Sequence, residues 1–302
     1  MTYLYIGSTG DHAGQSLITW AIGRRLVEKG LKVGLMKPFG ANPVQIGDAW
    51  ADRDALLFKE ILHLEERLDQ ICPYFLPGDQ WRGKGPDAIT EEVKALALEL
   101  RRNKDILLLL GSRDIFFDDI MRPVSDVEFV RELEAPFVLA HRYQRASASI
   151  YSILSIRSLL KDQMKGVIIN RVNPEKQSEV RTHLVPKLMQ SGIPFITAVF
   201  EDPSLSARSI KDIVASIEGE VLCGAEYMNR PAGGGTVGSS DLKEGLGVFK
   251  RVYNKIVLLA PSSPEVEVED NASARSITGI ILTGGRKPRS FRAEDTRPLP
   301  GR

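Results

Sequence analysis

The sequence lacks the features that would place the chain in a membrane, in a disulfide-stabilised fold or on a nucleic acid. Its 2 cysteines, Cys72 and Cys223, lie far apart, which is typical of reduced thiols rather than of a disulfide or metal pair. No run reaches the roughly eighteen apolar residues of a membrane span, and no basic segment precedes an apolar one at the N-terminus. With 40 basic and 39 acidic residues the net charge is +1, which gives no reason to expect nucleic-acid binding. We therefore expect a soluble cytoplasmic protein with no membrane or nucleic-acid partner.

Signatures of several common enzyme classes are also missing. The sequence has no Gly-x-Ser-x-Gly elbow and nothing that suggests a Ser or Cys triad. The 4 histidines show no metal-ligand spacing: they are His12, His63, His141 and His183.

Short apolar runs alternate with helical patterns along the first two-thirds of the chain. We expect strands at 3–6, 33–36, 106–110, 137–140, 167–169 and 195–199. Helices are expected at 17–29, 54–62, 90–101, 127–133, 150–161 and 178–190. This order predicts an α/β fold, a mostly parallel sheet with helices on both faces. Ligands of such sheets bind outside the carboxyl ends of the strands.

The character of the sequence changes near residue 215. After a helix expected at 209–217 comes a Gly-rich stretch, and then a smaller α/β unit with a helix at 242–252 and strands at 256–260 and 277–282. The tail from residue 286 is rich in Pro and Arg and is expected to be disordered. We predict a first domain at 1–217, a second at 218–286 and a disordered tail at 287–302.

A Gly-rich loop follows the first expected strand and leads into the first expected helix, which is the context that a nucleotide-binding loop requires. Gln15, however, stands where such loops carry Lys. The alternative is a Gly-rich turn that merely starts a helix. The candidate phosphate-binding residues of the loop are Gly10, Asp11, His12, Ala13, Gly14, Gln15 and Ser16.

Further candidates follow the other expected strands. Lys37 could reach the same phosphate, or it could be an exposed Lys before a turn. Asp52 and Asp54 could cap a helix, the more ordinary interpretation, or help to hold a metal. The third strand ends in Leu110, where an acidic residue would usually hold the metal. Asn170 could contact a nucleotide base or serve as a turn residue.

The order of these segments resembles the dethiobiotin-synthetase-like domain of long phosphate acetyltransferases. The resemblance covers residues 1 to about 224. It rests on segments 10–16, 33–38, 52–56, 135–139, 166–172, 192–195 and 218–224. The remainder resembles a DRTGG domain at 254–258 and 279–285, although the acidic motif that names that domain is not intact.

The resemblance implies a P-loop fold and a site for ATP and Mg²⁺. Carried over by position, Ser16 and Asp54 would hold Mg²⁺, and Lys37 would contact the substrate or phosphate. Two charged groups of dethiobiotin synthetases are replaced, the loop Lys by Gln15 and the strand-three acid by Leu110. Relatives fused to phosphate acetyltransferases also lack the loop Lys, and their domain is considered regulatory.

Three functions follow as hypotheses. The first is a regulatory sensor that binds ATP, another nucleotide or a small phosphate ligand without efficient catalysis. The second is an ATP-dependent, amide-forming ligase of the dethiobiotin synthetase type, with Lys37 as its catalytic candidate. The third is a purely structural oligomerisation protein. A homo-oligomer, or a protein partner bound through the C-terminal domain, is expected in addition to the small ligand.

Overall fold

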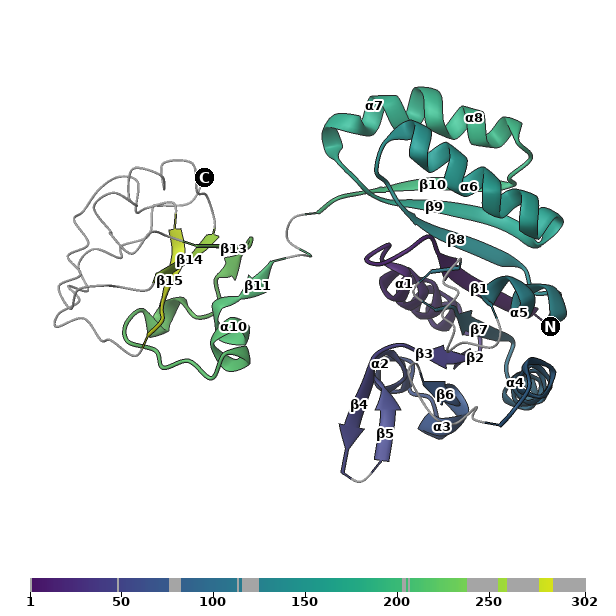
Figure 1. Cartoon of the computed structure of the whole chain (residues 1–302), viewed down its shortest axis with the longest axis horizontal. Helices are drawn as coiled ribbons and strands as arrows, with labels where there is room; N and C mark the ends of the chain where they lie inside the picture. The colour runs from purple at the N-terminus through teal and green to yellow at the C-terminus, as the bar shows by residue number, and fades with distance from the viewer. Residues whose placement is uncertain are drawn as a thin grey trace. The chain divides into compact units, whose positions relative to one another are not determined.

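The chain divides into two units, which are described separately. The computed structural model describes residues 2–47, 49–75, 83–112, 114–115, 125–202, 205, 207–237, 255–259 and 277–284. By contacts the units are Met1–Glu201 and Asp202–Arg302 (Figure 1). The sequence placed the boundary later, after residue 217. Helix α10 (Ile210–Ser216) groups with the second unit because the backbone N–H groups of Ile210 and Lys211 donate to the carbonyls of Arg230 and Met228.

A six-stranded sheet forms the centre of the first unit. Its strand order is β10-β9-β8-β1-β7-β2, and every neighbouring pair is parallel. The strands are β1 (Thr2–Ser8), β2 (Val33–Met36), β7 (Ile106–Leu110), β8 (Phe137–Arg142), β9 (Met164–Val172) and β10 (Phe195–Phe200). The six strands predicted in this part of the chain are confirmed, and so is the mostly parallel sheet with flanking helices.

Helices cover both faces of this sheet. They are α1 (Gln15–Glu28), α2 (Arg53–Ile61), α3 (Leu68–Ile71), α4 (Pro86–Arg101), α5 (Asp126–Glu132), α6 (Ala146–Leu160), α7 (Gln177–Glu179) and α8 (Val185–Gln190). Figure 1 shows α6, α7 and α8 together over β8, β9 and β10. The helix expected at 178–190 is interrupted by a π-helical turn, Val180–Leu184. Pro186 follows this turn and has no N–H for an α-helical bond, which accounts for the irregularity.

Strand β7 shows why its sequence is apolar throughout. Leu107 and Leu109 enter one core, which also contains residues of α4, α5 and α6. Leu108 and Leu110 enter a second core with residues of α1 and α2. Since side chains of a strand alternate between faces, a strand covered on both sides must be apolar at every position. The strand predicted at 106–110 is therefore covered on both of its faces.

Two small sheets between β2 and α4 were not predicted. Strand β3 (Phe39–Gly40) pairs with β6 (Tyr74–Phe75) in parallel. Strands β4 (Pro43–Ile46) and β5 (Ala49–Asp52) form an antiparallel hairpin that extends from the body next to α2 (Figure 1). The hairpin therefore connects the segment after β2 with the start of α2.

The described residues of the second unit form two short sheets. Strands β11 (Arg208–Ser209) and β12 (Pro231–Ala232) are antiparallel, and β13 (Gly235–Val237), β14 (Lys255–Leu259) and β15 (Ile277–Leu282) are parallel. The strand predicted at 277–282 is confirmed, and β14 confirms the one expected at 256–260 as far as residue 259. The helix expected at 242–252 and the tail from residue 286 lie outside the described residues.

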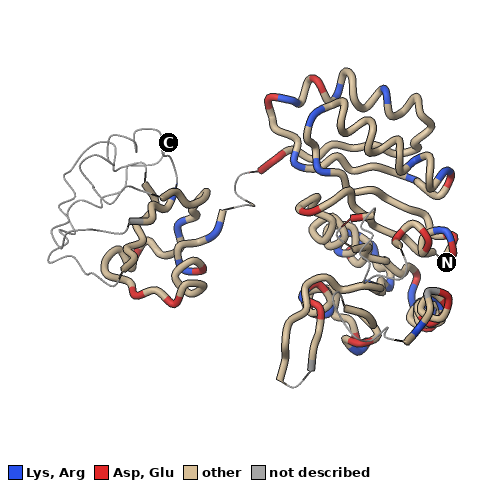
Figure 2. The backbone as a smooth tube through the Cα atoms, viewed as in Figure 1, with Lys and Arg blue, Asp and Glu red and all other residues tan. Residues whose placement is uncertain are grey.

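Charged residues of both signs are interspersed along the described backbone (Figure 2). Within the part of the chain that the structure describes, no helix has the length and apolar character needed to cross a membrane.

Candidate phosphate-binding site

The Gly-rich loop lies at the carboxyl end of β1, where the topology of the sheet reverses. Strand β1 stands between β7 and β8, and the chain crosses to β2 on one side before it later reaches β8 on the other. Crevices at such switch points are where open α/β sheets bind ligands. The backbone N–H of Thr9 donates to the Ala140 carbonyl, and the Thr9 hydroxyl bonds His141 Nδ1 at 2.9 Å. The loop is therefore fixed to the neighbouring strand where it begins.

Gly14 ends the loop in a conformation that few other residues adopt. It is the N-cap of α1 with φ 82, in the left-handed region. A Cβ atom there would lie 2.1 Å from Asn170 Nδ2, and that same nitrogen donates to the Ala13 carbonyl at 2.8 Å. Asn170 thus lies against the loop and braces it. The predicted contact of Asn170 with a nucleotide base stays a prediction.

Gly14→Ala is expected to destabilise the fold by about 2 kcal/mol, because it adds left-handed strain and displaces the Asn170 amide. Urea unfolding of both proteins measures this loss. Gly30→Ala is a matched control, since Gly30 has φ 82 but nothing within 4 Å of an added Cβ atom. Equal losses in the two variants would show that the contact with Asn170 contributes nothing.

The start of α1 offers backbone donors for an anion. No side chain caps the helix, and its first turn carries no acidic residue. The first N–H groups of a helix have no partner within the helix, and the helix dipole adds partial positive charge there. A side-chain cap would compete with a ligand for these donors, so a glycine N-cap suits an anion site.

A cavity of about 360 Å³ opens over the loop and the ends of β1, β2 and β7. Its described lining residues are Ser8, Gly10, Asp11, His12, Ala13, Gly14, Gln15, Ser16, Leu17, Lys37, Ala41, Asn42, Asp54, Leu110, Gly111 and Ser112. The structure thus brings the predicted loop residues together with Lys37 and Asp54. Asn170 is not among the lining residues and lies behind the loop.

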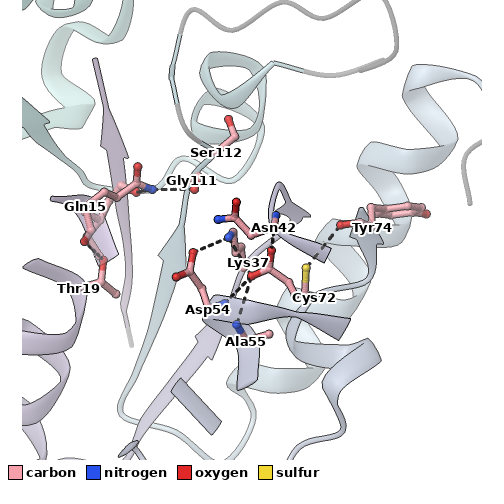
Figure 3. Close-up of polar contacts among 12 residues, drawn as sticks. Gln15, Thr19, Lys37, Asn42, Asp54, Ala55, Cys72, Tyr74, Gly111 and Ser112 are labelled. Carbon is pink, nitrogen blue, oxygen red and sulfur yellow. Dashed lines mark hydrogen bonds and ion pairs between the residues drawn. The ribbon is translucent and has the colours of Figure 1, made fainter. Parts of the chain in front are cut away.

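Gln15 lines this cavity, but its side-chain nitrogen is bonded to the protein's own backbone instead of facing a ligand as a loop Lys would. Its side-chain nitrogen donates to the carbonyls of Ile6 at 3.0 Å and Gly111 at 2.7 Å (Figure 3). An amide nitrogen has two N–H groups, so both are used. The side chain is buried and ties the start of α1 to the ends of β1 and β7. Gln15 therefore performs a structural task at the position of the missing cation.

Lys37 is buried, so the interpretation of an exposed Lys before a turn is wrong. Its ammonium bonds Asp52 Oδ1 at 2.9 Å and Asp54 Oδ2 at 2.6 Å, with the Lys37 side chain only 3% exposed (Figure 3). Burial works against the charge, but the carboxylates of Asp54 and Asp52 outweigh it and raise the pKa of Lys37. Lys37 is therefore charged at the cavity wall and paired with both carboxylates.

The two aspartates have different tasks. Asp52 is fully buried and caps α2, accepting from the backbone N–H groups of Asp54 and Ala55. The capping interpretation is confirmed for Asp52. The Asp54 side chain is 18% exposed and lines the cavity. The difference is set by position, since Asp52 lies at the end of β5 and Asp54 in the first turn of α2.

The predicted metal ligands supply only part of a coordination sphere. Ser16 and Asp54 line the same cavity, but one Asp54 oxygen is already bonded to Lys37. Leu110 is buried in the second core, so strand β7 offers no carboxylate here. No cluster of three or more His, Cys, Asp or Glu suited to a metal occurs among the described residues. A Mg²⁺ ion in this cavity would need phosphate oxygens and water as most of its ligands.

Several residues of the site were missed from the sequence. Asn42 lines the cavity, and its backbone N–H donates to Asp52 Oδ2, which anchors the β4–β5 hairpin. Ser112 also lines it and is held by Asp126 through both its N–H and its hydroxyl. A second cavity of about 310 Å³ adjoins Gly10 and Asp11 and includes Arg142. No motif marks these positions, because their place depends on the packing of distant segments.

A parallel sheet with a Gly-rich loop between β1 and α1 defines an α/β protein of the P-loop type. Residues 2–209 match the AAA_26 family model, described as an AAA domain. The match covers more than half of the chain, and the chain belongs to this family.

The chain is similar in sequence to two kinds of enzyme. It is 23% identical over 233 residues to phosphate acetyltransferase of Synechocystis sp., covering 75% of this chain and 33% of that protein. It is 26% identical over 223 residues to an ATP-dependent dethiobiotin synthetase of Thermodesulfovibrio yellowstonii, covering 66% of this chain and 90% of that protein. The chain thus spans about a third of the first relative's length. The resemblance of the first domain is confirmed as homology to both proteins.

Among solved structures, the MinC–MinD cell division complex of Aquifex aeolicus has a TM-score of 0.43 at 13% identity. That match covers 68% of this chain and 83% of the other chain. A likeness this distant carries no functional argument.

Proposed function

We propose that the chain is a sensor module that binds a nucleotide or another phosphate ligand without efficient phosphoryl transfer. The observation that carries this proposal is the pair of hydrogen bonds from Gln15 to Ile6 and Gly111. They commit the residue at the Lys position to the protein's own backbone. The glycines of the loop, the uncapped start of α1 and the cavity over them favour retained binding.

Binding and catalysis place different demands on such a site. Backbone N–H groups and a helix dipole can hold a phosphate without a cation. Phosphoryl transfer also needs positioned charge on the terminal phosphate, and losing such charge typically costs orders of magnitude in rate. Gln15 and Leu110 replace two charged groups that the related dethiobiotin synthetases are expected to use. The chain is related to phosphate acetyltransferase, and the regulatory role is proposed from the resemblance of its first domain to the N-terminal domain of the long enzymes of that kind.

A thermal-shift series combined with a phosphate-release assay tests the proposal. We expect ATP, ADP or another phosphate compound at millimolar concentration to raise the melting temperature saturably. We expect no Mg²⁺-dependent phosphate release above the background of Gly14→Ala. No change in melting temperature with ATP, ADP, GTP or acetyl phosphate would contradict ligand binding. Rapid Mg²⁺-dependent phosphate release would contradict the absence of catalysis.

A ligase of the dethiobiotin synthetase type is the second candidate. The observation in its favour is Lys37, which remains charged at the cavity wall. The ion pairs with Asp52 and Asp54 count against it, because they occupy the ammonium. This candidate requires Mg²⁺-dependent phosphate release that disappears in Lys37→Ala while the variant remains folded. Release that persists in the variant would remove its basis.

The remaining predictions belong to this proposal as well. The second unit would be a partial DRTGG-like domain that binds a protein partner or a second copy of the chain, in a cytoplasmic setting. A purely structural protein is the third candidate, and its sign would be an oligomer whose stability ignores all phosphate ligands. Sedimentation with and without ADP distinguishes the structural protein from the sensor, because the oligomer of a purely structural protein would not respond to ADP.

A further inference from the structure

The cavity holds little positive charge for a long polyphosphate. Among the described residues that line it, Lys37 is the one Lys or Arg. Asp11 and Asp54 contribute carboxylates to the same lining. A ligand that carries several negative charges therefore depends on backbone donors more than on side-chain cations.

The charge of Lys37 is more than balanced by its neighbours. Asp52 and Asp54 both lie within hydrogen-bond distance of its ammonium, so the three charges sum to −1. The raised pKa of Lys37 keeps the cation charged, and both carboxylates face it. A phosphate that approached Lys37 would also approach Asp54, which lies on the cavity side of the group.

The two ends of a polyphosphate meet different surroundings in such a loop. Backbone N–H groups hold the inner phosphates, while the loop Lys serves the β- and γ-phosphates. Here the backbone N–H groups for the inner phosphates are retained, whereas the Gln15 side chain is hydrogen-bonded to the carbonyls of Ile6 and Gly111. Both the β- and γ-phosphates would lose the loop Lys, but a β-phosphate would keep its backbone contacts, whereas a γ-phosphate would also meet repulsion from Asp54.

We infer that the site selects nucleoside diphosphates over the corresponding triphosphates. This inference rests on the proposed function, because it names the ligand class of the same loop. The preference is set by Asp54 and the absent loop cation. It is greatest without Mg²⁺, when the triphosphate carries its full charge.

Calorimetric titration of ADP and ATP in EDTA tests the inference on the full chain. We expect ADP to bind about five- to tenfold more tightly than ATP, the effect of one additional repelled charge at moderate separation. Equal or tighter binding of ATP would overturn the preference but leave the proposed function intact. No heat from either nucleotide at millimolar concentration would overturn the proposed function itself.

Asp54→Asn examines the cause of the preference. Removing this charge leaves Lys37 with one carboxylate, so ATP should gain affinity until it binds about as well as ADP. Asp69→Asn is the control, because Asp69 is 62% exposed, pairs with Arg67 and does not line the cavity. An unchanged ratio in Asp54→Asn, or a ratio that changes equally in Asp69→Asn, would contradict the assignment.

Discussion

Asp52→Ala is expected to lower the free energy of unfolding by about 3–5 kcal/mol, the usual cost of breaking a buried ion pair. Asp52 is fully buried. Its carboxylate accepts bonds from Lys37 Nζ and from the backbone N–H groups of Asn42, Asp54 and Ala55. The substitution therefore removes a helix cap, the anchor of the β4–β5 hairpin and one partner of a buried cation at once. Urea unfolding at neutral pH measures the loss.

Asp54→Ala is the matched control for this substitution. It removes the other carboxylate of Lys37, but from a partly exposed position that caps nothing. We expect a loss of about 1 kcal/mol or less, as for partly solvated ion pairs. Similar losses in both variants would contradict the structural role assigned to Asp52.

Acidification from pH 6.5 to pH 4 is expected to remove about 3 kcal/mol of stability through His141 alone. Burial lowers the pKa of His141 from 6.5 to about 4. In this window the unfolded chain binds a proton that the folded chain does not, so stability falls as the pH falls. From about one pH unit above 6.5 the imidazole is neutral in both states, and this contribution to the pH dependence vanishes.

His141→Asn isolates the effect, because the amide can still bond the Thr9 hydroxyl while the titrating ring is gone. Urea unfolding at a series of pH values should show a flatter profile for this variant than for the natural protein. His183→Asn, at an exposed histidine, should keep the original profile. Parallel profiles for the natural protein and His141→Asn would show that another group controls the acid response.

Local pattern was sufficient to predict the sheet and the frame of the site. The uninterrupted apolar run of β7 is the consequence of two cores, and the same packing explains why Leu110 offers no acid. The loop was recognisable because glycine is needed at Gly14, where the backbone is left-handed and Asn170 lies close. The apolar run and the glycine can be read in the sequence itself, although the two cores and the contact of Gly14 with Asn170 join distant segments.

The direction of individual side chains could not be predicted in the same way. Gln15 donates to the Gly111 carbonyl, 96 positions away in the chain, and Lys37 pairs with Asp52 of β5 and Asp54 of α2. The hairpin was missed although Gly47-Asp48 between two short strands is a recognised turn signal. Its strands carry polar and exposed residues, so apolar periodicity did not reveal them.

Titration of ADP into the natural protein and into Gly14→Ala, followed by calorimetry, tests the central claim most directly. The claim is that the loop still binds a phosphate ligand although its cation is gone. We predict saturable binding to the natural protein and a loss of at least about tenfold in affinity for the folded variant, because the added Cβ atom disturbs the end of the loop. Equal binding by both proteins, or binding by neither, would contradict the claim.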